Sequence, residues 1–253
     1  MTQNAIASAT PDLFYFIVAL TAAALLGIAK SGIKGIAVVI VTLMAISYGA
    51  KASTGILMPL LVVGDIFAIS YYRKEVQLHY IKKLMPTMVL GVLLGVYVGE
   101  RIPALLFKIG MLGIIISSVV FMLYWDSKKE KKVPTHWSFA ASFGILSGFT
   151  TMIGNLAGAF TSIYFLAHRL PKAAFIGTAA WLFFIINIFK IPFHIWVWET
   201  ITWDSLTISL KLLPALVAGL VLGIVLVKRI QEHNYRVLIL YFTLLGSIFM
   251  LLN

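Results

Sequence analysis

Long apolar runs separated by short polar stretches make up almost the whole chain. The apolar runs cover residues 13–29, 36–50, 55–72, 84–99, 104–124, 138–153, 156–167, 173–191, 206–227 and 237–252. A membrane-spanning helix needs about 20 predominantly apolar residues, a length that the longer runs approach or reach. The pattern therefore predicts a polytopic membrane protein built entirely from α-helices.

A sequence repeat divides the chain into two halves. At a constant offset of 128, nine of the 21 positions from 82 to 102 are identical in the second half. The identical pairs are Lys83/Lys211, Leu84/Leu212, Pro86/Pro214, Val89/Val217, Gly91/Gly219, Leu94/Leu222, Gly95/Gly223, Arg101/Arg229 and Ile102/Ile230. A second match, at offset 122, aligns 55–69 with 177–191 and sets Asp65 against Asn187. Such repeats are typical of secondary transporters, which bind substrate where the two halves meet.

The basic residues predict which side of the membrane each loop faces. The loops 73–83, 128–132 and 228–236 are rich in Lys and Arg, so we place them in the cytoplasm. The stretch 192–204 has no Lys or Arg and contains three tryptophans, so we expect an outer loop with an interfacial aromatic anchor.

These sides imply that 138–168 enters and leaves the membrane at the cytoplasmic face. Its two arms are shorter than a spanning helix, so we expect a hairpin of half-helices. The first half has the same plan, with a hairpin at 13–50 that starts outside, although the arm 13–29 could span alone. Each half is then a hairpin plus three membrane crossings. Because three is an odd number, the second half starts on the opposite side of the membrane from the first and has the inverted orientation.

We therefore expect three parts. Residues 1–125 form a first membrane repeat, 126–137 a basic cytoplasmic linker, and 138–253 a second, inverted membrane repeat. The runs 84–99 and 206–227 place Pro86 and Pro214 in first helical turns, where proline is tolerated.

Composition supports a membrane protein and narrows the function. The chain is 61% hydrophobic and 11% charged, whereas a soluble domain has about 25% charged residues. Its net charge of +11 lies mainly in short loops, which fits the positive-inside rule rather than nucleic-acid binding. There is no cysteine, the histidines lack metal-ligand spacing, and no nucleophile–base pattern occurs. We expect no enzyme activity, no metal and no cofactor.

The tips of the two predicted hairpins are the candidate substrate site. Each tip contains glycines, which let the backbone approach a ligand closely, and begins a half-helix whose N–H groups favour an anion. The candidate ligands are Lys30, Ser31, Lys34, Thr150, Thr151 and Asn155. The alternative is that Lys30 and Lys34 lie at the cytoplasmic interface and extend their ammonium groups into water.

Asp65 is the only acid inside an apolar run. It is a candidate proton-coupling carboxylate or an ion-pair partner for Lys34 or Lys190; the alternative is a permanently protonated acid hydrogen-bonded between helices. Asn187 takes the repeat-related position and Lys190 follows one turn later. We group Asp65, Asn187 and Lys190 as coupling or ion-pair residues, although Lys190 lies near the outer end of its run, which favours an interfacial position.

The glycine pairs Gly91/Gly95 and Gly219/Gly223 have GxxxG spacing. Small residues at this spacing let helices pack closely in membranes. The contact could lie within one chain or in a homodimer.

The second half resembles a known family in three segments. These are 148–159 (GFTTMIGNLAGA), 170–181 (LPKAAFIGTAAW) and 187–194 (NIFKIPFH), with a looser counterpart at 59–73. They resemble the sulfite exporter TauE/SafE family over essentially the whole chain. The resemblance implies a bacterial inner-membrane permease that exports small sulfur anions such as sulfite, thiosulfate, sulfoacetate or organosulfonates. Its two glycine-rich tips correspond here to 30–35 and 150–155, but Lys30-Ser31-Gly32-Ile33-Lys34-Gly35 departs from the glycine triplet of many members.

Three hypotheses follow. The first is a secondary transporter of a small sulfur-containing anion, with alternating access between inverted repeats and proton coupling through Asp65. The second is a cation transporter using Asp65 and Asn187, which a single intramembrane acid beside several lysines disfavours. The third is a non-transporting membrane assembly protein, which the internal repeat disfavours.

Overall fold

The computed structural model describes residues 13–33, 36–103 and 137–229, with six further residues between 105 and 117. Within these segments the chain forms eight α-helices and no strand. The helices are α1 (Leu13–Lys30), α2 (Ala37–Tyr48), α3 (Ala50–Tyr72), α4 (Leu78–Arg101), α6 (Trp137–Gly154), α7 (Ala157–Ala167), α8 (Lys172–Trp196) and α9 (Trp203–Arg229), with a 3-10 helix η1 at Arg73–Glu75. The predicted crossing at 104–124, the linker at 126–137 and the run at 237–252 lie largely or wholly outside the described segments.

Five of the described helices are long and apolar enough to cross a membrane. They are α1, α3 with η1, α4, α8 and α9. The second arms of the two predicted hairpins are short, with 12 residues in α2 and 11 in α7, whereas their first arms α1 and α6 have 18 each. The prediction of an all-helical, multi-pass membrane protein is confirmed.

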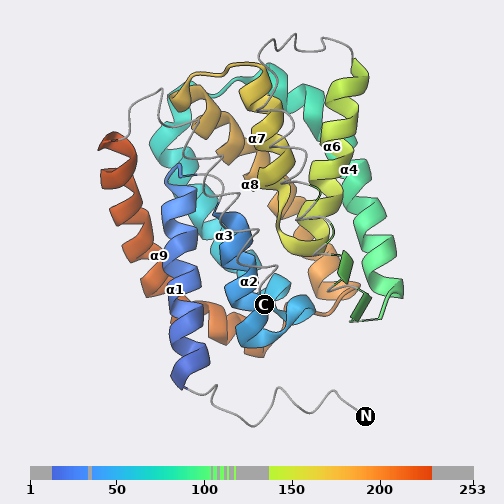
Figure 1. The fold of residues 1–253 in the computed structure, drawn as a ribbon, viewed down its shortest axis with the longest axis vertical. Helices are drawn as coiled ribbons and strands as arrows, with labels where there is room; N and C mark the ends of the chain where they lie inside the picture. The colour runs from blue at the N-terminus through green and yellow to red at the C-terminus, as the bar shows by residue number, and fades with distance from the viewer. Residues whose placement is uncertain are drawn as a thin grey trace.

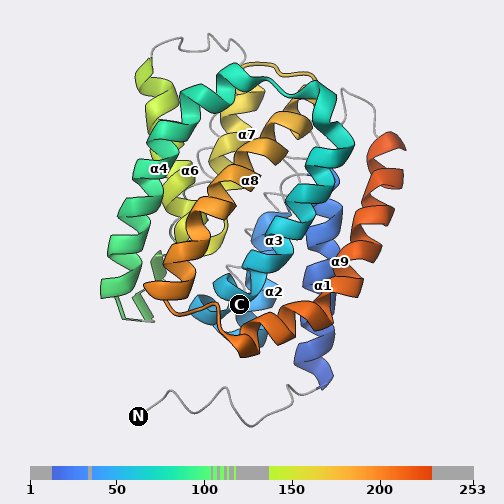
Figure 2. The same cartoon turned by 180° about the vertical axis from the view of Figure 1, so that it is seen from behind.

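The helices form two flanking pairs around a central crossing pair. Helices α1 and α9 lie together on one side and α4 and α6 on the other, while α3 and α8 cross between them (Figure 1; Figure 2). The hairpin α1–α2 lies against α3, and α7 follows α6 back toward the start of α8. The two hairpins therefore face the crossing helices from opposite halves of the chain.

The glycine pairs are packing positions within this chain. A side chain at Gly91 would meet backbone of Ile145 and Phe149 in α6, and one at Gly219 would meet backbone of Ala24 in α1. Because a Cβ atom at either glycine would overlap the facing backbone, each pair of helices needs glycine to approach this closely.

The two ends of the molecule carry different charges. At one end the Lys172 ammonium donates to the Val227 carbonyl at 2.7 Å and Lys228 lies over the Tyr71 ring. This end holds most of the described basic residues outside the interior: Arg73, Lys74, Lys82, Lys83, Arg169, Lys172, Lys228 and Arg229. At the other end, the start of α3 meets the loop after α8, where Gly55 packs on Thr200.

Several helix ends differ from the prediction, and α3 begins at Ala50 rather than at 55. The outer loop is shorter than 192–204, because α8 continues through Pro192 to Trp196. Helices α4 and α9 begin earlier than expected, at Leu78 and Trp203. Pro86 and Pro214 therefore lie inside helices, so their placement in first turns was wrong. Buried apolar residues such as Ile81 extend α4 in spite of its polar neighbours.

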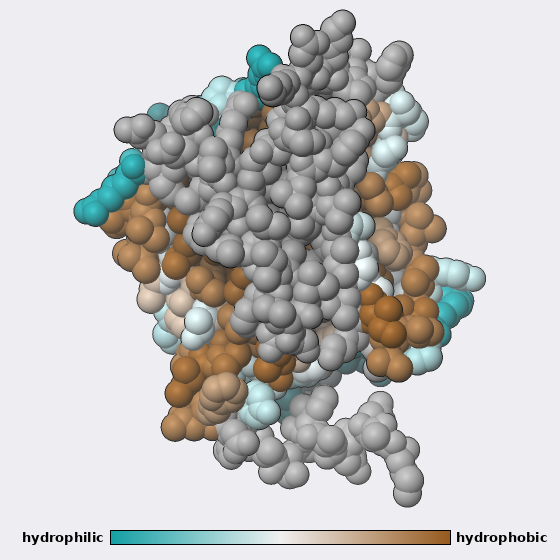
Figure 3. Space-filling model, viewed as in Figure 1, coloured by the Kyte–Doolittle hydropathy of each residue, from teal (hydrophilic) through white to brown (hydrophobic). Residues whose placement is uncertain are grey.

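The outer faces of the long helices are apolar, as a lipid-facing surface requires. Exposed leucines and valines follow one side of α4 and one side of α9. In the part that Figure 3 colours, apolar residues cover the flanks and hydrophilic residues gather toward the ends. Since water would not favour this surface, it is suited to the hydrocarbon of a bilayer.

Candidate functional site

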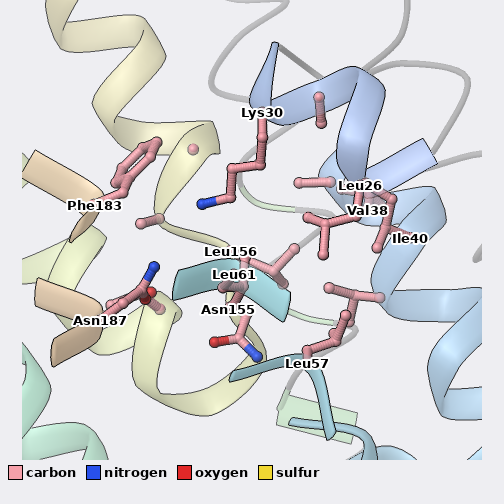
Figure 4. Close-up of a pocket in the computed structure, with 16 residues that line it drawn as sticks. Leu26, Lys30, Val38, Ile40, Leu57, Leu61, Asn155, Leu156, Phe183 and Asn187 are labelled. Atoms are coloured by element: carbon pink, nitrogen blue, oxygen red, sulfur yellow. The ribbon is translucent and has the colours of Figure 1, made fainter. Parts of the chain in front are cut away.

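A cavity lies where both hairpins meet the two crossing helices. Its volume is about 80 Å³, and a single water molecule needs roughly 10–15 Å³ by the same measure. Its walls come from the end of α1, the start of α2, the middle of α3 and α8, and the turn between α6 and α7. The lining residues are Leu26, Ala29, Lys30, Ala37, Val38, Ile40, Val41, Leu57, Leu61, Thr151, Asn155, Leu156, Ala157, Gly158, Phe183 and Asn187 (Figure 4).

Two short helices begin at this cavity. Helix α2 starts with Ala37 and α7 with Ala157, and neither N-terminus has a side-chain cap. Residues of both first turns line the cavity. The first N–H groups of a helix lack partners within it and carry partial positive charge, so these two N-termini make the cavity favourable for an anion.

The turn before α7 brings a polar side chain to the cavity. Asn155 has φ of 57°, a left-handed conformation that Asn adopts more readily than most residues. Its N–H donates to the Thr151 carbonyl at 3.0 Å, and the Leu156 N–H donates to the Thr150 carbonyl at 3.2 Å. These bonds give two carbonyls near the end of α6 their hydrogen-bond partners, and they hold Asn155 at the cavity.

Lys30 and Asp65 form a buried ion pair. The Lys30 ammonium lies 2.5 Å from Oδ1 of Asp65, and the two residues are only 6% and 0% exposed. The ammonium also lies 5.7 Å from the centre of the Phe183 ring. Figure 4 shows the lysine side chain reaching from the end of α1 toward α8.

A second lysine anchors the other side of the site. The Lys190 ammonium donates to Thr151 Oγ1 at 3.1 Å, to Asn155 Oδ1 at 2.7 Å and to Asn187 Oδ1 at 3.4 Å. Asn187 Nδ2 donates in turn to Asp65 Oδ2 at 2.7 Å. One hydrogen-bonded chain therefore runs from Lys30 through Asp65 and Asn187 to Lys190.

The residues that the sequence suggested fall into three groups. Lys30, Thr151, Asn155 and Asn187 line the cavity, and Asp65 and Lys190 lie behind them.

The remaining candidates lie elsewhere. Ser31 donates to the Leu220 carbonyl at 2.7 Å and packs on α9, and Thr150 donates to the Ser147 carbonyl at 3.3 Å. Neither Ser31 nor Thr150 lines the cavity. Lys34 lies outside the described residues.

One expectation about the lysines was wrong. Lys190 is not an interfacial side chain, since it is fully buried. The described ion-pair partner of Asp65 is Lys30, which points inward and does not extend into water. Lys190 contacts Asp65 only through Asn187.

The sequence did not indicate two features of the site. Phe183 lies within an apolar run, where nothing distinguishes it from its neighbours. The Thr54 carbonyl accepts from Asn155 Nδ2 at 3.3 Å, and a backbone acceptor leaves no mark in a sequence. Gly158, which follows the second glycine-rich tip in the sequence, also lines the cavity, and a Cβ there would meet no atom within 4 Å.

The site suits electrostatic binding of an anion. The amino groups of Lys30 and Lys190 and two helix N-termini lie around a single carboxylate, Asp65, so groups that attract an anion outnumber the one acid. In the described segments no group of His, Cys, Asp and Glu could hold a metal ion.

The sequence profile of the sulfite exporter TauE/SafE family matches residues 11–250. The chain belongs to this family. Sulfite exporters of this kind are membrane transporters, in agreement with the apolar helices and the buried cavity. No curated protein and no solved structure matches the chain.

Proposed function

We propose that the chain is a secondary transporter that exports a small sulfur-containing anion, such as sulfite or an organosulfonate, across the bacterial inner membrane. The observation that supports this proposal most directly is the cavity itself, which is lined by the uncapped N-termini of α2 and α7 and by Lys30. Backbone N–H groups at helix N-termini together with a buried ammonium are suited to an oxyanion.

The charges of the site support an anion over a cation. Asp65 already accepts from Lys30 and Asn187, so neither carboxylate oxygen is left without a donor. Lys190 has no acid partner among the described residues, and a charge inside a bilayer is costly unless compensated. A bound anion would supply that compensation.

Alternating access between inverted repeats at 1–125 and 138–253, joined by a cytoplasmic linker at 126–137, is the proposed mechanism. Asp65 and Asn187 are repeat-related and touch each other between α3 and α8. Residues identical in both halves have similar environments: Leu84 and Leu212 are fully buried, whereas Leu94 and Leu222 are about half exposed. These likenesses support a two-fold relation, with the cavity near its axis.

Proton coupling through Asp65 completes the proposal. An anion in the cavity attracts the Lys30 ammonium, which weakens the ion pair with Asp65. A buried carboxylate that loses its counter-ion favours its protonated form. Anion binding would therefore promote proton uptake at Asp65, so anion and proton would cross together, flux would respond to a pH gradient, and export would follow the outward gradient of the anion itself.

The test is sulfite flux into proteoliposomes that contain the purified protein, with and without an imposed pH gradient. We expect saturable flux that the gradient accelerates, and loss of most flux in Lys30→Met. Lys211→Met is the matched control, because Lys211 is exposed on α9 and does not line the cavity. Folded protein that moves no sulfur anion would contradict the proposal.

A further inference from the structure

Lys190 fixes the orientation of the two asparagine side chains of the site. An ammonium group can only donate hydrogen bonds, so the groups facing it must be acceptors. The oxygens of Asn155 and Asn187 therefore point at Lys190, at 2.7 and 3.4 Å. All three Lys190 donors are used, since the third goes to Thr151 Oγ1.

Both amide nitrogens consequently point away from Lys190. Asn187 Nδ2 donates to Asp65 and Asn155 Nδ2 donates to the Thr54 carbonyl. Each amide nitrogen carries two protons, so one N–H of each has no acceptor within the described part of the chain. The Thr151 hydroxyl accepts from Lys190, and its own proton likewise has no described acceptor.

Lys30 adds further donors. One N–H of its ammonium donates to Asp65, and the other two N–H groups have no acceptor within the described segments. Asp65 itself, the only buried acid of the described residues, does not line the cavity. The four polar side chains that line the cavity are Lys30, Thr151, Asn155 and Asn187, and all four have donors available, while the side-chain oxygens of the last three are directed at Lys190, which does not line the cavity.

We propose that this cavity selects anions whose oxygens carry no proton and rejects anions that carry an O–H group. The inference rests on the proposed function, because it describes the ligand of the same site. A donor-bearing anion would place its O–H against a protein donor, and a buried donor left without an acceptor is strongly unfavourable. Lys190 is then a positioning residue for selectivity, acting through Asn155 and Asn187.

A pair of matched ligands tests the rule. Methanesulfonate and the monoanion of methylphosphonate have the same shape and charge, but only the phosphonate carries an O–H at mildly acidic pH. We expect methanesulfonate to bind the purified protein about tenfold or more tightly, measured by direct calorimetric titration of each ligand at the same mildly acidic pH. Equal affinities for the two ligands would overturn the rule.

Lys190→Met tests the role of the lysine. Without the ammonium, Asn155 and Asn187 can rotate and present oxygens to the cavity, so we expect the preference for methanesulfonate to shrink several-fold. Overall affinity should also fall, because a positive charge is lost, but the ratio of the two affinities is the decisive readout. Lys211→Met should keep the wild-type ratio, and an unchanged ratio in Lys190→Met would refute the positioning role.

Transport and selectivity can fail separately. Selective binding without sulfite flux would retain the donor-only site and overturn the transport function. Flux without discrimination between the two ligands would retain transport and overturn the selectivity rule. Binding of neither ligand would overturn the selectivity rule. If Lys190→Met does not fold, the comparison of ligands on the wild-type protein still decides the rule.

Discussion

Lys30 and Asp65 depend on each other in the interior, because neither charge is exposed to water. Removing one partner of a buried ion pair strands the other and costs about 3–5 kcal/mol, whereas replacing both by neutral groups can be nearly neutral. The same pair connects the cavity to the second lysine through Asn187. The contribution of the Lys30–Asp65 pair to stability can therefore be measured separately from its contribution to transport.

We predict that Asp65→Asn lowers the free energy of unfolding by about 3 kcal/mol and that the double variant Lys30→Met/Asp65→Asn recovers most of it. Thermal unfolding in detergent micelles measures the four proteins of this cycle. The double variant should remain inactive in sulfite flux, because the cavity has lost its ammonium. Simple addition of the two single losses would show that the two charges are not coupled.

The sequence identified Asp65 because an acid within an apolar run is rare and costly. The sequence misplaces Lys190, because the apolar run ends one residue after this lysine and so predicts a position at the membrane interface. The structure continues α8 to Trp196, which moves Lys190 away from the helix end and into the interior. Hydrogen-bond partners contributed by α6 decide its environment, and a linear pattern does not contain them.

At the scale of helices, the sequence predicts close contacts between helices from the spacing of their glycines. It does not predict where the helices begin and end. Gly95 in α4 faces Met152 of α6, and Gly223 in α9 faces Ser31 beside α1. Their GxxxG spacing carries this information locally. Helix ends depend on tertiary contacts, so α4 begins at Leu78 rather than at 84, and Pro86 lies within it.

Helix α7 offers a direct test of the cavity, because its second residue is Gly158. A Cβ atom there would meet no atom within 4 Å, so a longer side chain would start from open space and extend among the lining residues. We predict that Gly158→Leu abolishes sulfite flux while the protein stays folded. Gly158→Ala should keep flux and gain up to about 1 kcal/mol in stability, because alanine favours helix over glycine.

Flux and thermal unfolding of both Gly158 variants provide the readout. The Gly158→Ala protein controls for loss of glycine flexibility, so the comparison isolates the filled volume. Unchanged transport by a folded Gly158→Leu protein would mean that the anion does not pass through this cavity.

For the whole molecule, the two ends differ in charge as the positive-inside rule requires. The loop after α3 is basic and contacts the start of α8, where Gly177 lies beside Tyr72. The loop after α8 carries Glu199 and lies at the start of α3. Since α8 joins the two loops as a single helix, they must lie at opposite ends of it.

We predict that the loop holding Lys74 faces the cytoplasm and the loop holding Glu199 faces the outside. The chain has no cysteine, so Lys74→Cys and Glu199→Cys each introduce a single thiol, and both positions are exposed. A membrane-impermeant maleimide should label Glu199→Cys in spheroplasts and Lys74→Cys only in inverted vesicles. Labelling of both thiols from one side would contradict a membrane-spanning α8, and the reverse pattern would invert the assigned orientation.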